Sequence, residues 1–114
     1  MSISWGRRQR FKFTAGGGLI GWTPPNTSAV YAITYKQDPQ NKPKSHTVLF
    51  FGHSEDLSRE PIQSRHVLDL WENNGGSANE LYVFIHPMPG STQWNRITVH
   101  EQLVSEYAPD CNRY

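Results

Sequence analysis

Three short runs of β-branched, aromatic and aliphatic residues place the strongest constraint on the fold of this chain. The runs are Val30 to Tyr35, Thr47 to Phe51 and Leu81 to Ile85. Each has the length of a β-strand and is bounded by polar, proline or glycine residues. The polar stretch 36–44 contains two prolines, so we expect the first two runs to pair as an antiparallel hairpin with a long connection.

Helical signals follow the second run. Ser54 offers an N-cap for a helix whose apolar face begins at Leu57, and Pro61 stops or kinks that helix. A second helix is predicted from Ile62 to Glu72, where the apolar residues share one face.

A last helix is predicted after the third run. Ser91 is expected to cap it and Pro109 marks its end. Its apolar stripe is predicted to hold Trp94, Ile97, Leu103, Val104 and Tyr107. The order strand, strand, helix, helix, strand, helix predicts an α+β fold rather than a doubly wound parallel sheet.

Charge is unevenly distributed along the chain. Residues 1–44 carry seven Lys/Arg and one Asp, whereas residues 45–114 carry four Lys/Arg and nine Asp/Glu. This asymmetry predicts a basic, Gly-rich N-terminal extension over 1–25 and a mildly acidic domain over 26–114. The basic residues are Arg7, Arg8, Arg10 and Lys12, and they alternate with Trp5, Phe11 and Phe13.

Two interpretations of this extension remain open. The basic and aromatic residues suit contact with the phosphates and bases of nucleic acid. Alternatively, they form an edge strand whose aromatic residues face the core. The stretch Ala15 to Gly18 is predicted to be a flexible hinge or turn, since it lacks the Lys and Ser/Thr of a phosphate-binding loop.

Length and composition exclude several classes of protein. The 114 residues fit one domain, and no run approaches the roughly 18 apolar residues of a membrane span. No apolar stretch follows the basic N-terminus, so we expect no signal peptide. The single cysteine, Cys111, excludes an internal disulfide, fits a cytoplasmic protein and is expected to serve packing rather than nucleophilic catalysis.

Three segments together resemble the GIY-YIG nuclease superfamily. They are Ser28 to Ile33, Val48 to Leu57 with its Gly-x-Ser-x-x-Leu pattern, and Leu103 to Asn112 with its Leu-x-x-x-Tyr-x-Pro-x-x-Asn pattern. The resemblance covers roughly residues 28–112. It implies a three-stranded, mainly antiparallel sheet flanked by helices, and an activity that cleaves phosphodiester bonds.

The same resemblance implies that several catalytic positions are substituted. The family uses two tyrosines, an arginine on the first helix and a metal-binding glutamate on the last helix. Tyr31 matches the first tyrosine, but Phe50 stands at the second. Glu60 stands at the arginine position, with Arg59 beside it. His100 stands at the glutamate position, with Glu101 beside it.

The candidate site therefore combines matched and neighbouring residues. It consists of Tyr31, His53, Arg59, His100 and Glu101. Glu101 is the candidate ligand for Mg²⁺ or Mn²⁺, since a single imidazole is a poor site for hard cations. His53 is a candidate base or phosphate contact, and His100 is alternatively a partly buried, hydrogen-bonded histidine. Asn112 is expected to tie the C-terminal turn to the body through its amide.

Three functional hypotheses follow. The first is a degenerate GIY-YIG domain that binds DNA or RNA, or another partner, without cleavage. The second is an active, divergent, metal-dependent endonuclease in which Arg59 and Glu101 replace the usual pair. The third is a protein-interaction module without a nucleic-acid function. None of the three involves a membrane or sets an oligomeric state.

Overall fold

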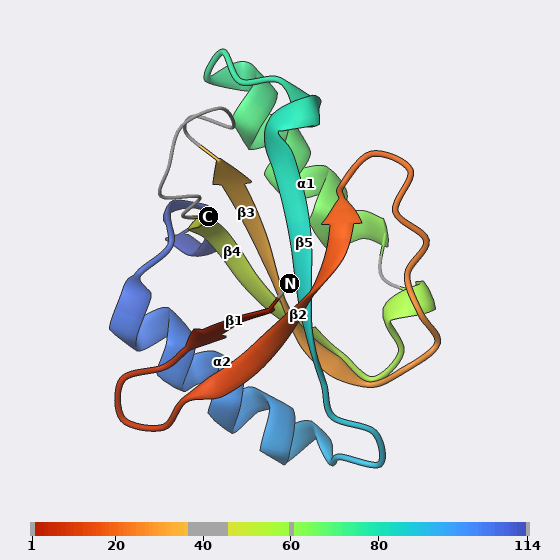
Figure 1. Ribbon diagram of the computed structural model, residues 1–114, viewed down its shortest axis with the longest axis vertical. Coiled ribbons are helices and arrows are strands. Elements are labelled where there is room, and N and C mark those ends of the chain that lie inside the picture. Colours follow the sequence, from red (N-terminus) through yellow and green to blue (C-terminus); the bar gives the residue numbers. More distant parts are fainter. Residues whose placement is uncertain (1, 37–45, 60, 114) are drawn as a thin grey trace.

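The computed structural model describes residues 2–36, 46–59 and 61–113, and within them five strands form one antiparallel sheet (Figure 1). The strands are β1 (Ser2–Trp5), β2 (Phe11–Gly18), β3 (Ala29–Lys36), β4 (His46–Ser54) and β5 (Leu81–Pro87), in the spatial order β1-β2-β5-β3-β4. Two α-helices accompany the sheet, α1 (Pro61–Asn73) and α2 (Gln93–Tyr107). Short 3₁₀ turns η1, η2 and η3 lie at Leu57–Arg59, Ala78–Glu80 and Asp110–Arg113.

The predicted α+β class is confirmed, and β3, β4 and β5 correspond to the three predicted strands. Their sheet is larger than expected, because the N-terminal segment adds two strands beside β5. The helix predicted from Ile62 to Glu72 is α1. No helix in the described ranges is long and apolar enough to cross a bilayer.

The N-terminal segment pairs with the sheet from its first described residue. β1 and β2 form an antiparallel hairpin whose register runs from Ser2 opposite Thr14 to Trp5 opposite Phe11. The side chains of Trp5, Phe11 and Phe13 are buried, whereas the arginines of the connecting loop are exposed. The interpretation in which these aromatic residues face the core is therefore confirmed, and they are not available for stacking on bases.

The glycine stretch was predicted to be a hinge, and this prediction is wrong. β2 continues through Gly18 and pairs with β5, with a bulge between Ala15 and Gly17. A Cβ atom added at Gly16 would lie 3.1 Å from Trp22 Nε1 and 3.3 Å from Val83 O. Glycine therefore allows the Trp22 indole to approach the strand, and pairing with β5 overrides the local flexibility of the sequence.

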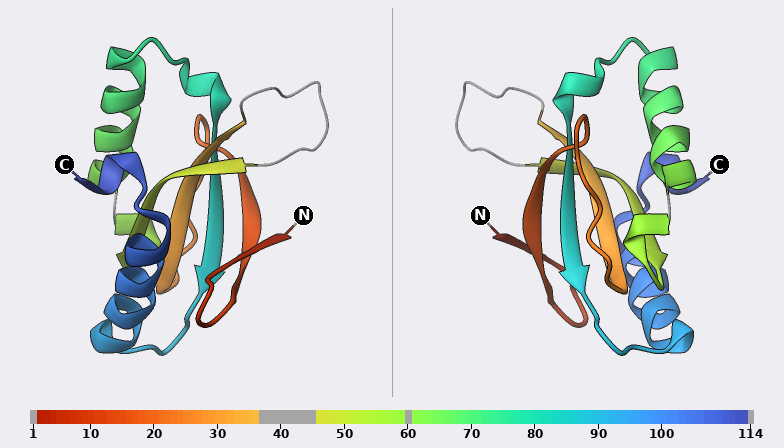
Figure 2. Two further views of the ribbon diagram at one scale, coloured as in Figure 1. Left: turned by 90° about the vertical axis from the view of Figure 1, so that its left-hand side faces the viewer. Right: turned by 90° about the vertical axis from the view of Figure 1, so that its right-hand side faces the viewer.

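Both faces of β3, which lies between β5 and β4, are buried, and the interior is divided into two cores. The α1-side core contains Ala29, Tyr31, Ile33, Leu49, Leu57, Val67, Leu81, Val83, Ile85 and Cys111. The α2-side core contains Trp5, Phe11, Phe13, Val30, Ala32, Phe51, Phe84, Val99 and Leu103. Figure 2 shows α1 and α2 one above the other beside the sheet. Cys111 packs in the interior as expected.

The helix boundaries follow from local capping. α1 begins at Pro61, which suits the first turn because that turn needs no N–H donor. α2 is capped by Thr92 rather than by the predicted Ser91: Thr92 Oγ1 accepts from the Asn95 N–H at 3.1 Å, and the Asn95 side chain reaches back to Thr92. At the other end, Ala108 adopts a left-handed conformation (φ 43°) and donates to Val104 O at 2.8 Å.

Gly52 and Tyr31 face each other across β3 and β4, and the ring of Tyr31 covers the glycine. A Cβ atom at position 52 would lie 2.4 Å from Tyr31 Cζ. Because the ring is almost completely buried in a packed core, it has little room to move aside. The glycine of the second sequence segment thus has a packing role that is independent of any chemistry.

We predict that Gly52→Ala lowers the free energy of unfolding by about 1–3 kcal/mol, since the added methyl overpacks the core. Chemical denaturation followed by tryptophan fluorescence measures the effect. Gly18→Ala is the matched control, because a Cβ atom there meets only Leu81 O at 3.9 Å. Equal stability of the Gly52→Ala variant and the native protein would contradict the packing role of the glycine.

Candidate functional site

The sheet separates the residues that the sequence predicted to form one site. Tyr31 is buried in the α1-side core, where its ring centroid lies 6.1 Å from that of Phe50. His53 lies one position beyond Gly52 on β4, so its side chain points to the opposite face, toward α2. The two positions that match the family's tyrosines therefore share one face, and the histidines lie on the other.

His53 and His100 do come together. Their ring centroids are 5.0 Å apart with the planes at 65°. His100 Nε2 lies 2.9 Å from Phe51 O, and because a carbonyl can only accept, this nitrogen is the donor. The interpretation of His100 as a partly buried, hydrogen-bonded histidine is thereby confirmed, and its Nε2 atom is not available as a metal ligand.

The surroundings of His53 and His100 disfavour the protonated form of both imidazoles. Burial lowers the pKa of His100 from 6.5, although the bond to Phe51 O and the charge of Glu101 oppose this effect. Burial also lowers the pKa of His53, and the nearby His100 and Arg96 lower it further. The two rings are therefore neutral at physiological pH, and either can act as an acceptor through its free ring nitrogen.

Asn112 completes this part of the structure. Its Oδ1 atom accepts from the Phe51 N–H at 2.8 Å, and its Nδ2 atom donates to Phe51 O at 2.8 Å. The predicted role of Asn112 in tying the C-terminal turn to the body is confirmed. The Phe51 carbonyl thus accepts from both Asn112 and His100.

Arg59 and Glu101 do not converge on the two histidines. Arg59 is the last residue of η1, its side chain is exposed, and its Nε atom lies 3.4 Å from Asp56 Oδ2. Glu101 is exposed on the outer side of α2, and Glu60 lies outside the described residues. Across the described ranges, no group of three or more His, Cys, Asp or Glu side chains is arranged to hold a metal ion.

The basic residues of the N-terminal segment lie against the C-terminal half of α2. The backbone N–H groups of Arg7 and Arg8 donate to the two carboxylate oxygens of Glu106 at 2.8 and 2.9 Å. These bonds lower the pKa of Glu106. The guanidinium carbon of Arg7 lies 5.3 Å from the centroid of the Tyr107 ring. Arg8 and Arg10 are exposed beside α2, and Lys12 is exposed on β2.

The position of Trp94 on α2 differs from the prediction. Its side chain was expected to face the core, yet it is 74% exposed. Nine residues separate it from the buried Leu103, which amounts to roughly 180° around a helix. The core-facing stripe is instead centred on Arg96, Val99 and Leu103. A helical wheel centred on Val99 would have placed Trp94 outside.

Trp94 and Thr98 form a ridge between two surface troughs, and the buried Gln102 lines both troughs. The outer trough, of about 600 Å³, is lined by Arg8, Trp94, Ile97, Thr98, Glu101, Gln102, Ser105 and Glu106. The inner trough, of about 670 Å³, is lined by Gln9, Arg10, Phe11, His86, Met88, Trp94, Asn95, Thr98, Val99 and Gln102. Gln102 Nε2 donates to Gln9 O at 3.0 Å, which fixes the arginine-bearing loop against the ridge.

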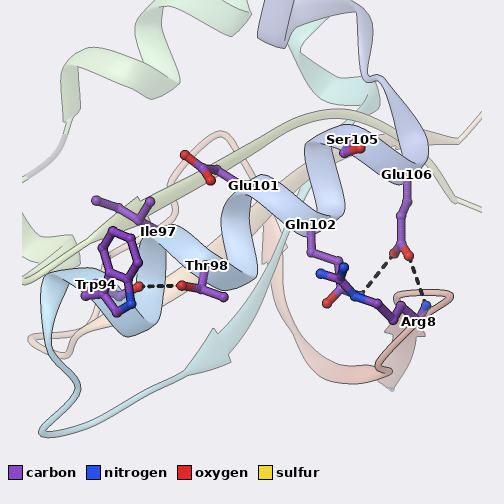
Figure 3. A pocket seen from close by; sticks show the side chains of 8 residues that line it. All are labelled: Arg8, Trp94, Ile97, Thr98, Glu101, Gln102, Ser105 and Glu106. Atoms are coloured by element: carbon purple, nitrogen blue, oxygen red, sulfur yellow. Dashed lines mark hydrogen bonds between the residues drawn. The ribbon is translucent and has the colours of Figure 1, made fainter.

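Figure 3 shows the outer trough along α2, with Trp94 at one end and Arg8 at the other. The twelve residue-to-residue steps from 94 to 106 correspond to about 18 Å of helix. The arrangement sets one exposed indole and two exposed guanidinium groups on one surface, with Arg8 in the outer trough and Arg10 in the inner one. Such a surface can stack on a planar group and contact anions beside it.

Comparison of the chain with protein families, with curated proteins and with solved structures gives no match.

The two histidines predict a pH dependence of stability. Because both pKa values are lower in the folded state, the unfolded chain binds protons more tightly, and folding is favoured above pH 6.5. We expect the free energy of unfolding to fall as the pH decreases below about 6.5, as measured by urea denaturation.

The control is the His53→Gln, His100→Gln double variant, in which glutamine retains a donor for Phe51 O. The pH dependence of this variant should be smaller than that of the native protein between pH 7.5 and 5. Asp56 and Glu106 also have lowered pKa values, but their unfolded-state values of 3.8 and 4.5 place most of their contribution below this window. An unchanged pH dependence in the double variant would rule out the histidines as its origin.

Proposed function

We propose that this protein is a degenerate relative of the GIY-YIG nucleases that binds single-stranded nucleic acid without cleaving it. The observation that carries the proposal is the exposed Trp94 on the ridge between two arginine-lined troughs. The sequence resemblance supports descent from a phosphodiester-binding domain. The positions of Trp94, Arg8 and Arg10 support retention of a nucleic-acid surface, which lies on α2 and the β1–β2 loop.

An exposed tryptophan beside cations suits a single strand better than a duplex. Unstacked bases present flat faces to an indole, and each such contact contributes about 1–3 kcal/mol to binding. Arg8 and Arg10 lie on either side of the ridge, where they can contact phosphates of a strand that crosses it. A double helix would keep its bases stacked and would offer Trp94 only the backbone and groove edges.

Two carboxylates moderate the charge of this surface. Glu101 and Glu106 both line the outer trough. The carboxylate of Glu106 is already bonded to the N–H groups of Arg7 and Arg8, so part of its charge is compensated locally. We therefore expect modest affinity with a shallow salt dependence, because two phosphate contacts on a single strand give a slope of about −1.4 in log K against log salt.

The distribution of the family-type residues supports the absence of cleavage. Phosphodiester hydrolysis requires a base for water and cationic groups around one phosphorus atom. Here Tyr31 is buried on one side of the sheet, Arg59 is paired with Asp56, and Glu101 faces outward. These three side chains do not surround a common point where a phosphate group could sit.

Trp94→Ala is expected to weaken binding of fluorescent oligo-dT or oligo-U by about 1–3 kcal/mol, as measured by fluorescence anisotropy. Trp94→Phe should retain most of the affinity, because a smaller ring still stacks. Ile20→Ala is the matched control, since Ile20 is a large apolar side chain that is 60% exposed and lines neither trough. Equal affinity of Trp94→Ala and Ile20→Ala would refute a base-stacking role.

Arg8→Ala with Arg10→Ala is expected to remove most of the salt dependence of binding, since these are the proposed phosphate contacts. The slope is obtained from anisotropy titrations over a range of KCl concentrations. Arg59→Ala is the control, because this exposed arginine lies outside both troughs. A slope that falls equally in the control would show that only net charge matters.

Cleavage is tested in the same samples with Mg²⁺ or Mn²⁺. Cutting by the native protein that is lost in Arg59→Ala, Glu101→Ala would favour the divergent endonuclease instead. Absence of both binding and cutting at high protein concentration would favour the protein-interaction module.

A further inference from the structure

A third pocket, of about 470 Å³, lies where β4 ends and α2 begins. Its lining comes from His53, Ser54 and Glu55 on one side and from the start of α2 on the other, including Ser91, Thr92 and Arg96. It shares no lining residue with either trough beside Trp94. This pocket is therefore separate from the proposed nucleic-acid surface.

Arg96 is the unusual component of this pocket. Its side chain is only 3% exposed although it carries a permanent positive charge. Nη1 donates to Ser91 O at 2.8 Å and to Ser91 Oγ at 2.9 Å, but the buried Nε atom has no hydrogen-bond partner. No carboxylate of the described residues lies within ion-pairing distance of the guanidinium.

A buried guanidinium without a counterion is unfavourable. Removing a charge from water costs several kcal/mol unless an opposite charge and hydrogen bonds compensate, and an unsatisfied donor adds to this cost. The hydrogen bonds to Ser91 are both to neutral oxygens and leave the charge uncompensated. An anion bound beside this guanidinium would therefore be electrostatically favourable.

The start of α2 adds a second source of positive potential. A helix of 15 residues carries a partial positive charge at its N-terminus, where the first N–H groups lack acceptors within the helix. Thr92 Oγ1 satisfies the Asn95 N–H, and Thr92 O accepts from the Arg96 N–H. Gln93 lines the pocket, and its N–H has no acceptor among the described residues.

The remaining polar groups are compatible with an oxyanion. The His53 ring and the Ser91 hydroxyl line the same pocket and can donate hydrogen bonds, whereas the Thr92 hydroxyl already donates to Asn95 Oδ1 at 2.9 Å. Glu55 is the one carboxylate among the lining residues, and its side chain is exposed at the rim. Guanidinium, helix N-terminus and hydroxyl groups together form the donor set that proteins use for phosphate.

We propose that this pocket binds a phosphate group, held by the Arg96 guanidinium, the N–H groups at the start of α2 and the side chain of His53. The group comes either from free phosphate or from a terminal phosphate monoester of a nucleotide or strand. In both cases the ligand supplies the counterion that the buried arginine lacks.

Titration of ¹⁵N-labelled protein with sodium phosphate tests the proposal without any substitution. At constant ionic strength adjusted with NaCl, phosphate should shift the amide signal of Gln93 and the Nε–H signal of Arg96, with saturation. The Trp22 and Trp71 side-chain signals are internal references remote from the pocket. Equal shifts with NaCl alone would overturn the proposal.

Arg96→Met is the decisive variant, because methionine fills similar space without charge. Since an uncompensated buried charge is removed, we expect this variant to fold with equal or higher stability. Its phosphate affinity should fall at least about tenfold, whereas Arg59→Ala should bind as the native protein does. If Arg96→Met does not fold, His53→Gln and Ser91→Ala should each weaken phosphate binding several-fold, and unchanged affinity in both would overturn the proposal.

The source of the phosphate is distinguished by comparing inorganic phosphate, AMP and adenosine in the same titration. Equal shifts with phosphate and AMP indicate a site open to terminal monoesters, and shifts with phosphate alone indicate a site for the free ion. Both results support the proposal. Shifts with adenosine equal to those with AMP would overturn it. Trp94→Ala should leave phosphate binding unchanged, so failure here is separable from failure of the nucleic-acid surface.

Discussion

The backbone of Phe51 is the point on which the arrangement of the elements depends. β4 is an edge strand, so the outward N–H and C=O groups of Phe51 need partners that a further strand would otherwise supply. Asn112 pairs with both groups and His100 adds a second bond to the carbonyl. The side chain of the same residue packs in the α2-side core. One residue of the sheet edge thereby positions α2 and the C-terminal turn together.

The consequence for the site is geometric. Because α2 is held at Phe51, His100 lies beside His53. Arg96 then lines the pocket at the end of β4. Trp94 is then carried outward, on the far side of the same helix, next to the loop that Gln102 and Glu106 hold. The proposed phosphate pocket and the proposed nucleic-acid surface thus lie on two different faces of α2, and neither includes Tyr31.

The central part of the fold is predictable from the sequence because its local signals agree with the final structure. The apolar runs that become β3, β4 and β5 are each bounded by strong turn residues, and α1 begins at a proline. The N-terminal strands were less predictable, since Gly16 to Gly18 have low strand propensity and are held in β2 by their partner β5. The pairing of β2 with β5 joins segments that are far apart in the sequence, so the local residue pattern does not predict it.

The site was only partly predictable. The resemblance identified His53 and His100, and these two side chains do meet. It also grouped them with Tyr31. However, Tyr31 lies opposite Gly52, and His53 is the next residue after Gly52 on β4, so the side chains of Tyr31 and His53 lie on opposite faces of the sheet. Arg96 is not among the predicted site residues. Its spacing, three positions before Val99 and seven before Leu103, nevertheless indicates a charged side chain on the buried stripe of α2. Only the structure shows that this guanidinium has no carboxylate partner among the described residues.

The contacts that join the two ends of the described chain also bear on how this protein folds. Gly6 donates to the Tyr107 hydroxyl across 101 positions, and Arg7 to Glu106 across 99. Such distant contacts form late, because the entropy of closing a long loop is lost before they become favourable. The β3–β4 hairpin and α1 can assemble first, whereas the α2-side core closes only when both ends arrive. During synthesis the aromatic side chains of the N-terminal hairpin therefore stay exposed to solvent until α2 has been made and can cover them.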